Sequence, residues 1–205
     1  MIDIKKYVAY IVSSKEQNIE CHGVGVLVDN MLITAGHVVD SATNVIASFE
    51  DTSYALNHAN QLFLQSMDND DKDPMHNDIA IYRIEDRNSP LKLSDTLPVV
   101  NQSFSNVYFE EQSVVSDDKT LPEFLRTTTT LSVEQSESTY VGLVEGNFIG
   151  CNTEKILHEG NSGCPIIEDD IVYGILHGGI PGEHTCFYQS SKSIMNCINN
   201  LKVLS

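Results

Sequence analysis

The residues best suited to chemistry lie in the segment from Gly160 to Pro165, which reads Gly-Asn-Ser-Gly-Cys-Pro between a polar loop and apolar runs. Glycines on both sides of Ser162 permit a tight turn that displays the serine hydroxyl. The backbone N–H groups of Gly160 and Ser162 can converge there on one point, as in sites that stabilise an oxyanion. The segment indicates nucleophilic chemistry at Ser162, although an ordinary Gly-Ser turn has the same composition.

A serine hydroxyl becomes a useful nucleophile only beside a base, which is usually held in place by a carboxylate. His37 follows the apolar run from Leu32 to Gly36, which is predicted as a strand that ends in small residues. Asp78 opens the apolar run from Ile79 to Ile84, where an unpaired charge would be costly. Each residue alone is equally consistent with a structural histidine or a turn aspartate. Together they are candidates for the base and its orienting carboxylate.

The elements that must position these residues are mainly strands, because short apolar runs and period-two patterns outnumber helical ones. Such strands, separated by Asp, Asn, Gly and Ser turns, favour barrels or a sandwich. A helix is predicted near the end, where Ile194, Cys197, Ile198 and Leu201 share one face behind Ser190 and Ser191. The predicted strands are Tyr7 to Ser13, Val24 to Val28, Leu32 to Thr34, Asn44 to Phe49, Gln61 to Gln65, Ile79 to Ile84, Val107 to Glu110, Thr127 to Val133, Tyr140 to Val144, Ile166 to Glu168 and Ile171 to Leu176.

The composition excludes several classes of function. The 205 residues include 12 Lys plus Arg and 29 Asp plus Glu, a net charge of −17 that repels nucleic acids and anionic membranes. No apolar run is long enough to span a bilayer, and the run from Tyr7 to Val12 has no cleavage pattern after it, so we expect neither a membrane span nor a signal peptide. Five cysteines without a Cys-x-x-Cys pair indicate reduced thiols and a cytoplasmic location.

No cofactor is expected. The acidic segment from Asp68 to Asp73 lacks the glycine and the distal glutamate of a helix-loop-helix calcium loop, so a solvated loop is favoured over a metal site.

In the order His, Asp, Ser, the segments Thr34 to His37, Asn77 to Ala80 and Gly160 to Pro165 resemble the signatures of the trypsin-like, chymotrypsin-fold serine proteases. Tyr173 to Gly179 resembles the strand on which that family lays the substrate backbone. The resemblance covers nearly the whole chain. It implies an all-β fold of two six-stranded antiparallel β-barrels with the active site between them, followed by a C-terminal α-helix. One peptidase domain would then hold the first barrel in residues 1–90, the second in 91–189 and the helix in 190–205.

The resemblance also implies roles. His37 would act as general base and then acid, Asp78 would orient it, Ser162 would be the nucleophile, and the N–H groups of Gly160 and Ser162 would form the oxyanion hole. The activity implied is that of a serine endopeptidase, which hydrolyses peptide bonds through an acyl-enzyme.

The resemblance places further residues against the substrate. Ile156 would lie at the base of the primary specificity pocket and favour a neutral or apolar residue before the scissile bond. His177, Gly178 and Gly179 would lie along the substrate backbone. His177 has the alternative of facing Asp78 and helping to hold it, and an inert structural role also stays open.

Departures from the family pattern indicate a branch. Asn161 stands where secreted members carry an aspartate that pairs with a new amino terminus, and Val38 stands where they have a bridging cysteine. The zymogen switch and that disulfide are therefore not expected. In both features the chain resembles the bacterial high-temperature-requirement and glutamyl-endopeptidase branches of the family. Some viral relatives bind zinc, and an alternative zinc site here would use His158, His184, Cys151 and Cys186, at poor spacing.

A different class of function is a catalytically silent protease fold used for binding or scaffolding. The retained His37, Asp78 and Ser162 favour the enzyme, and Cys164, two residues past the serine, is a poor alternative nucleophile. Our hypothesis is an intracellular bacterial serine endopeptidase of narrow or regulated specificity. Its partner would be a protein or peptide substrate, and a regulatory partner protein stays an open alternative. We expect binding to neither nucleic acid nor membrane.

Overall fold

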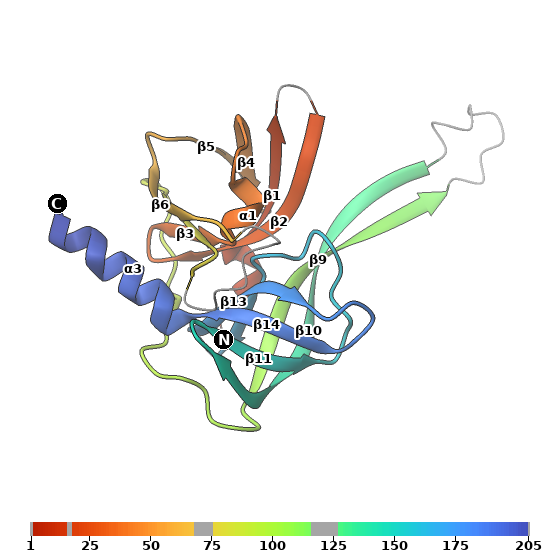
Figure 1. Ribbon diagram of the computed structural model, residues 1–205. Helices are drawn as coiled ribbons and strands as arrows, with labels where there is room; N and C mark the ends of the chain where they lie inside the picture. The colour runs from red at the N-terminus through yellow and green to blue at the C-terminus, as the bar shows by residue number, and fades with distance from the viewer. Residues whose placement is uncertain (1, 16–17, 68–75, 116–126, 205) are drawn as a thin grey trace.

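The computed structural model describes residues 2–15, 18–67, 76–115 and 127–204 (Figure 1). The predicted acidic loop at 68–73 lies outside them. A single turn of 3-10 helix, η1 (Ile4–Tyr7), precedes the first sheet. That sheet is antiparallel, and its described strands run in the order β5-β4-β1-β2-β3-β7-β6. The bounds are β1 (Val8–Lys15), β2 (Asn18–Val28), β3 (Met31–Thr34), β4 (Asn44–Ser48), β5 (Ser53–Leu56), β6 (Gln61–Gln65) and β7 (Ile79–Arg83).

The second sheet closes on itself. Its described strands run in the order β12-β9-β10-β11-β14-β13-β8, and β12 also pairs with β13, so the strands from β12 to β13 form a closed six-stranded barrel. The short β8 joins β13 in parallel. Helix α3 (Ser191–Leu204) follows β14 directly. The bounds are β8 (Lys92–Leu93), β9 (Ser103–Val115), β10 (Thr127–Glu145), β11 (Phe148–Thr153), β12 (Pro165–Glu168), β13 (Ile171–Gly179) and β14 (Thr185–Ser190).

The predicted fold class is confirmed: the described chain is all-β, with two barrel-like sheets and a C-terminal helix. The first sheet differs in detail, because its described part has seven strands rather than the expected six. Two predicted strands, Thr127 to Val133 and Tyr140 to Val144, are parts of the single long strand β10. The sequence reading missed β5, β8, β11 and β14, which are short or carry polar residues at buried positions.

A shared apolar core joins the two sheets. Strand β7 is buried on both faces: Ala80 and Tyr82 belong to the core of the first sheet, whereas Ile79 and Ile81 pack towards the second sheet and α3. This explains why the run from Ile79 is continuously apolar rather than alternating. The residue before β7, Asp78, is consequently held at the seam between the two barrels.

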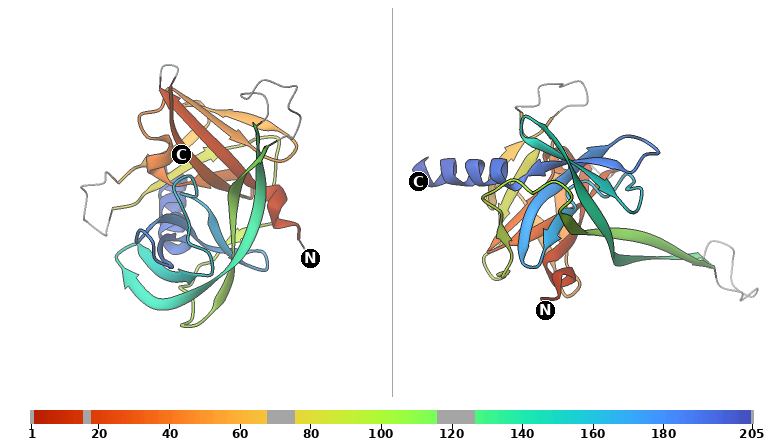
Figure 2. Two further views of the ribbon diagram at one scale, coloured as in Figure 1. Left: turned by 90° about the vertical axis from the view of Figure 1, so that its right-hand side faces the viewer. Right: turned by 90° about the horizontal axis from the view of Figure 1, so that it is seen from below.

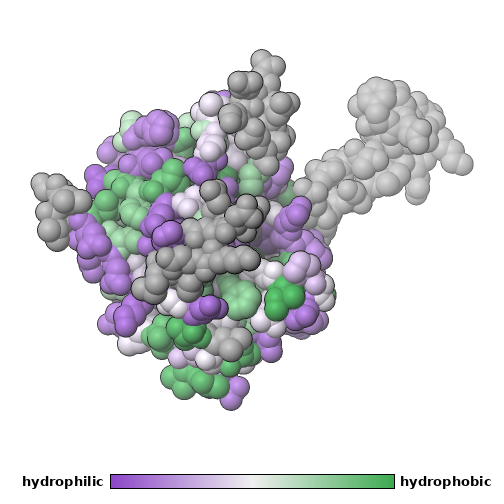
Figure 3. All heavy atoms as spheres, viewed as in Figure 1, coloured by the Kyte–Doolittle hydropathy of each residue, from purple (hydrophilic) through white to green (hydrophobic). Residues whose placement is uncertain are grey.

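The β9–β10 hairpin extends well beyond the barrels as a two-stranded arm (Figures 1 and 2). The two strands pair continuously from Thr139↔Ser103 to Thr127↔Val115. The near end of the arm belongs to the barrel. On the body of the molecule, the face seen in Figure 3 carries polar and apolar residues side by side.

All five cysteines are free thiols, and four of them are buried. None of the helices in the described ranges is long and apolar enough to cross a membrane.

Candidate active site

Asp78 is a fully buried carboxylate at the start of β7. Its Oδ1 accepts the backbone N–H of His37 at 2.8 Å, and its Oδ2 lies 2.6 Å from His37 Nδ1. A second imidazole, His177, places its Nδ1 2.7 Å from the same Oδ2. Burial raises the pKa of Asp78, but the hydrogen bonds from His177 and His37 outweigh burial and hold that pKa well below its usual range. Asp78 is therefore an ionised acceptor.

His37 lies on a one-turn helix, α1 (Gly36–Val39), rather than at the end of a strand as predicted. Strand β3 ends at Thr34, and the chain turns so that the Asp40 N–H bonds the Gly36 carbonyl at 3.0 Å. The turn brings both the backbone and the ring of His37 onto Asp78. Because an ionised carboxylate can only accept, His37 must carry its proton on Nδ1, which leaves Nε2 free to act as a base.

Ser162 lies in a turn that both barrels hold. Its carbonyl accepts the Val24 N–H of β2 at 2.7 Å, and the next N–H, of Gly163, bonds the Leu176 carbonyl of β13 at 2.7 Å. Gly163 has φ +88°, and a Cβ there would come within 2.0 Å of the Val24 carbonyl oxygen. Only glycine fits this position, because the conformation is left-handed and the first barrel's backbone is too close.

The two N–H groups expected to form an oxyanion hole are those of Gly160 and Ser162. Within the described residues, neither of them donates a hydrogen bond to another protein group, whereas the intervening Asn161 N–H bonds the His158 carbonyl at 3.2 Å. Gly160 has φ +93°. The turn thus leaves two N–H donors available on either side of Asn161.

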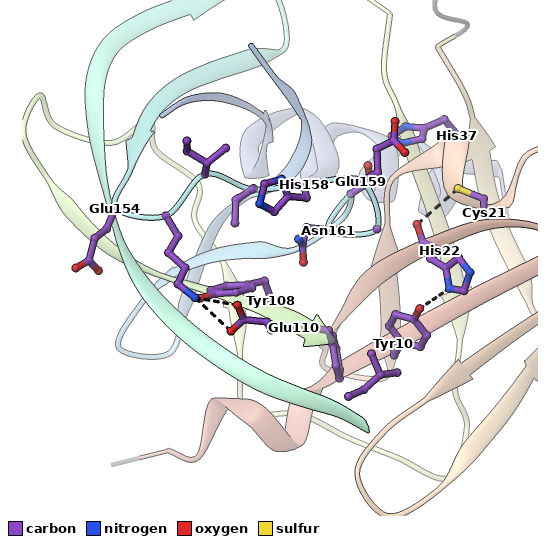
Figure 4. Close-up of a pocket in the computed structure, with 17 residues that line it drawn as sticks. Tyr10, Cys21, His22, His37, Tyr108, Glu110, Glu154, His158, Glu159 and Asn161 are labelled. Carbon is purple, nitrogen blue, oxygen red and sulfur yellow. Dashed lines mark hydrogen bonds and ion pairs between the residues drawn. The ribbon is translucent and has the colours of Figure 1, made fainter. Parts of the chain in front are cut away.

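His37 and Ser162 line the same cleft, of about 1220 Å³ (Figure 4). In the figure, Tyr10 and His22 lie on one side of the segment from His158 to Asn161, and Tyr108 and Glu154 lie on the other. Among the hydrogen bonds of the described residues, none joins the Ser162 hydroxyl to the His37 ring. Catalytic hydrogen bonds in unliganded sites are commonly long and tighten with substrate.

The remaining predicted residues fall at different places. Ile156 is half-buried and lines the cleft. Gly178 and Gly179 pair with Phe187 and Cys186 of β14 on one edge of β13, and in the described structure their other edge has no strand partner. For His177, the contacts bear out the interpretation that it faces Asp78.

Gln189 is a site residue that the sequence reading missed. It is fully buried, and its Oε1 accepts the Asp78 N–H at 2.8 Å. Its Nε2 lies 2.6 Å from the hydroxyl of Ser193 on α3. A polar residue directly after the apolar run from Cys186 to Tyr188 is the signal that could have found it, but β14 itself was not predicted. Gln189 fixes the backbone of Asp78 from the second barrel.

The only cluster of three metal-ligating groups in the described ranges is His37, Asp78 and His177. Their N···O separations of 2.6 and 2.7 Å are hydrogen-bond lengths, whereas ligands at about 2.0 Å from a tetrahedral zinc lie roughly 3.3 Å apart. Of the four alternative zinc residues, Cys151 and Cys186 are cross-strand partners on β11 and β14, but no three of the four form a cluster of metal-ligating groups. The His184 Nδ1 instead lies 2.8 Å from the Thr153 carbonyl oxygen.

Comparison with known proteins identifies the family. The family model described as Trypsin matches residues 6–198 of the chain. The chain belongs to the trypsin family of serine proteases. The cleft that His37 and Ser162 line is formed by residues of both chymotrypsin-like barrels. No curated protein matches this trypsin-family chain.

Solved structures of the same fold cover most of the chain. The active form of the Rv3671c protease from M. tuberculosis is 14% identical with a TM-score of 0.68, and the alignment covers 97% of this chain and 82% of that one. A serine endoprotease from Yersinia pestis is 16% identical with a TM-score of 0.66, over 97% and 63%. A scabies mite inactivated protease paralogue is 16% identical with a TM-score of 0.64, over 100% and 98%. At such identities, these likenesses show the fold alone.

Proposed function

We propose that this trypsin-family chain is a serine endopeptidase in which His37, Asp78 and Ser162 form the catalytic triad. The observation that carries the proposal is the buried, ionised Asp78 bonded to His37 Nδ1, in a cleft that His37 shares with Ser162. The two available N–H donors in the turn around Ser162 support it. An inactivated paralogue with the same fold shows why activity needs its own test.

In the proposed mechanism, His37 Nε2 takes the Ser162 proton as the hydroxyl attacks the scissile carbonyl. The N–H groups of Gly160 and Ser162 hold the resulting oxyanion, and Asp78 stabilises the imidazolium without taking its proton. The imidazolium then gives the proton to the leaving amine. Water, activated by His37 in the same way, hydrolyses the acyl-enzyme. Loss of one oxyanion donor would raise the barrier by about 3–4 kcal/mol.

For the substrate, we propose a neutral or apolar residue before the scissile bond, with Ile156 at the base of its pocket. The open edge of β13 at Gly178 and Gly179 suits an extended peptide, which would add as a strand. The partners are thus a protein or peptide substrate and, for regulation, a further protein.

The proposal extends to the setting of the enzyme. The five free thiols suit a reducing, cytoplasmic compartment. Asn161 before the serine and Val38 after the histidine support a place near the bacterial high-temperature-requirement and glutamyl-endopeptidase branches. We treat the chain as one peptidase domain divided at residues 90 and 189, with narrow or regulated specificity.

The test is reaction of the purified protein with a fluorophosphonate probe, followed by mass spectrometry to locate the adduct. We expect the adduct on Ser162, its loss in Ser162→Ala and His37→Ala, and no change in Ser53→Ala, which alters an exposed serine far along the sequence. A folded protein that forms no adduct would contradict the proposal and favour a silent binding or scaffold module.

A further inference from the structure

His177 owes its orientation to an irregularity in the second barrel. On β13, Leu176 pairs with Tyr188 and Gly178 pairs with Phe187, so His177 is an extra residue without a partner of its own on β14. Such β-bulges bend a strand locally and re-aim the side chain of the extra residue. Here the side chain reaches Asp78, across the seam between the barrels, with Nδ1 2.7 Å from Oδ2.

One carboxylate oxygen therefore serves two imidazoles. Asp78 Oδ2 lies 2.6 Å from His37 Nδ1 and 2.7 Å from His177 Nδ1. Since Asp78 is ionised, both rings must donate from Nδ1, and both keep a free lone pair on Nε2. The two rings meet edge to face, with centroids 5.9 Å apart.

The ring of His177 contacts a carboxylate, a second imidazole and an aromatic ring. Within the described ranges, the titratable groups in direct contact with its ring are Asp78, from the start of β7, and His37, from α1. Phe148 of β11 packs on the ring at 4.9 Å, and β14 places Phe187 and Tyr188 opposite the residues that flank it. About 30% of the His177 side chain is exposed, which lets the ring exchange protons with solvent.

We propose that His177 is a positioning residue that shares Asp78 with His37, so that protonation of His177 weakens the basicity of His37. This inference rests on the proposed function, because it assigns a role within the same triad. When His37 takes the serine proton, its imidazolium relies on the negative charge of Asp78. If His177 already carries a proton, that charge is already compensated, and a second cation would form close by.

The two histidines then titrate as a coupled pair with two macroscopic steps. The reaction rate would fall on acidification with a slope steeper than one proton and approaching two. Replacement of His177 by glutamine keeps a neutral donor for Asp78 but removes the second titration. In His177→Gln the slope of the rate against pH should fall to one. The ratio of the two proteins' reaction rates would then change by up to about tenfold with each further pH unit.

The first experiment does not depend on activity. Long-range proton–nitrogen NMR of the unaltered protein should show both rings with the proton on Nδ1 and should show two titration steps at each ring. In His177→Gln, and in His177→Asn should the first variant fail to fold, His37 should titrate in one step. The exposed His58→Gln is the matched control and should leave the two steps unchanged. Independent one-step titration of the two rings in the unaltered protein would overturn the proposal.

The second experiment measures the rate of fluorophosphonate labelling of Ser162 against pH in the same proteins. A slope above one in the unaltered protein that falls to one in His177→Gln supports the proposal. A slope of one in both, with only a lower rate in the variant, would mean a merely structural role and overturn it. Coupled titration without any labelling of Ser162 would contradict the proposed protease function but support the coupling of the two histidines. Labelling of Ser162 with uncoupled titration would support the protease function but overturn the coupling.

Discussion

Replacement of Gly163 by alanine should destabilise the protein strongly, because a Cβ there would clash with the backbone of the first barrel. A Cβ at this position would lie 2.0 Å from the Val24 carbonyl oxygen and 2.7 Å from the Thr34 hydroxyl. The first atom belongs to the β2 backbone and cannot rotate away. The turn must therefore shift, and the hydrogen bonds Val24 N–H to Ser162 and Gly163 N–H to Leu176, both 2.7 Å, would be lost.

The expected cost follows from these contacts. Left-handed conformation costs an L-residue about 1–2 kcal/mol, and each lost hydrogen bond costs about 0.5–1.5 kcal/mol. The sum is roughly 2–5 kcal/mol, a large part of the roughly 5–15 kcal/mol that stabilises a typical domain. Gly182→Ala is the matched control, because Gly182 has φ +77° with no atom within 4 Å of the added Cβ and would show conformational strain alone.

The assay is urea unfolding followed by tyrosine fluorescence and circular dichroism, which suits a chain with eight tyrosines and no tryptophan. The free energy of unfolding should fall by at least about 1 kcal/mol more in Gly163→Ala than in Gly182→Ala. Equal losses in the two variants would refute the close approach of β2 to the serine turn.

Three further results are expected. The folded-state pKa of Asp78 lies below its ordinary value of 3.8, so its ionised form contributes stability that is fully present above that pH and is lost as pH falls below it. Asp78→Asn should remove up to about 1.4 kcal/mol per pH unit from the acid dependence of unfolding, and unchanged acid dependence would argue against the buried charge. A thiol reagent at pH 8 should modify Cys21, in the cleft wall, before Cys151, whose pKa burial raises to about 12; mass spectrometry over time would reveal the opposite order. Gln189→Leu leaves the Asp78 N–H without its partner and should cost about 1–3 kcal/mol in unfolding, with slower probe labelling; wild-type values for both would show that Gln189 does not position Asp78.

The sequence could predict the fold class and the three triad candidates, because local patterns carry that information. Period-two runs indicate strands, and the glycines around Ser162 report a turn that only they can adopt. The sequence left the position of His177 open, because the orientation of its side chain depends on a one-residue bulge in β13. A shift of one residue turns a strand side chain to the other face of the sheet, and no sequence pattern announces the bulge. Gln189 was missed because its role depends on a contact between the barrels, with a residue 111 positions earlier.

The hydrogen bonds that hold Asp78 link the geometry of the triad to the packing of the two barrels. Its ring and backbone partners come from α1 in the first half and from β13 and β14 in the second, so neither half can assemble the triad alone. A small separation of the barrels would leave each sheet intact while it dismantled the site. Proteins open in such partial steps at lower free energies than global unfolding. The geometry of the site would then depend on how closely the two barrels pack. A partner that changed this packing would alter the contacts to Asp78 without touching the cleft.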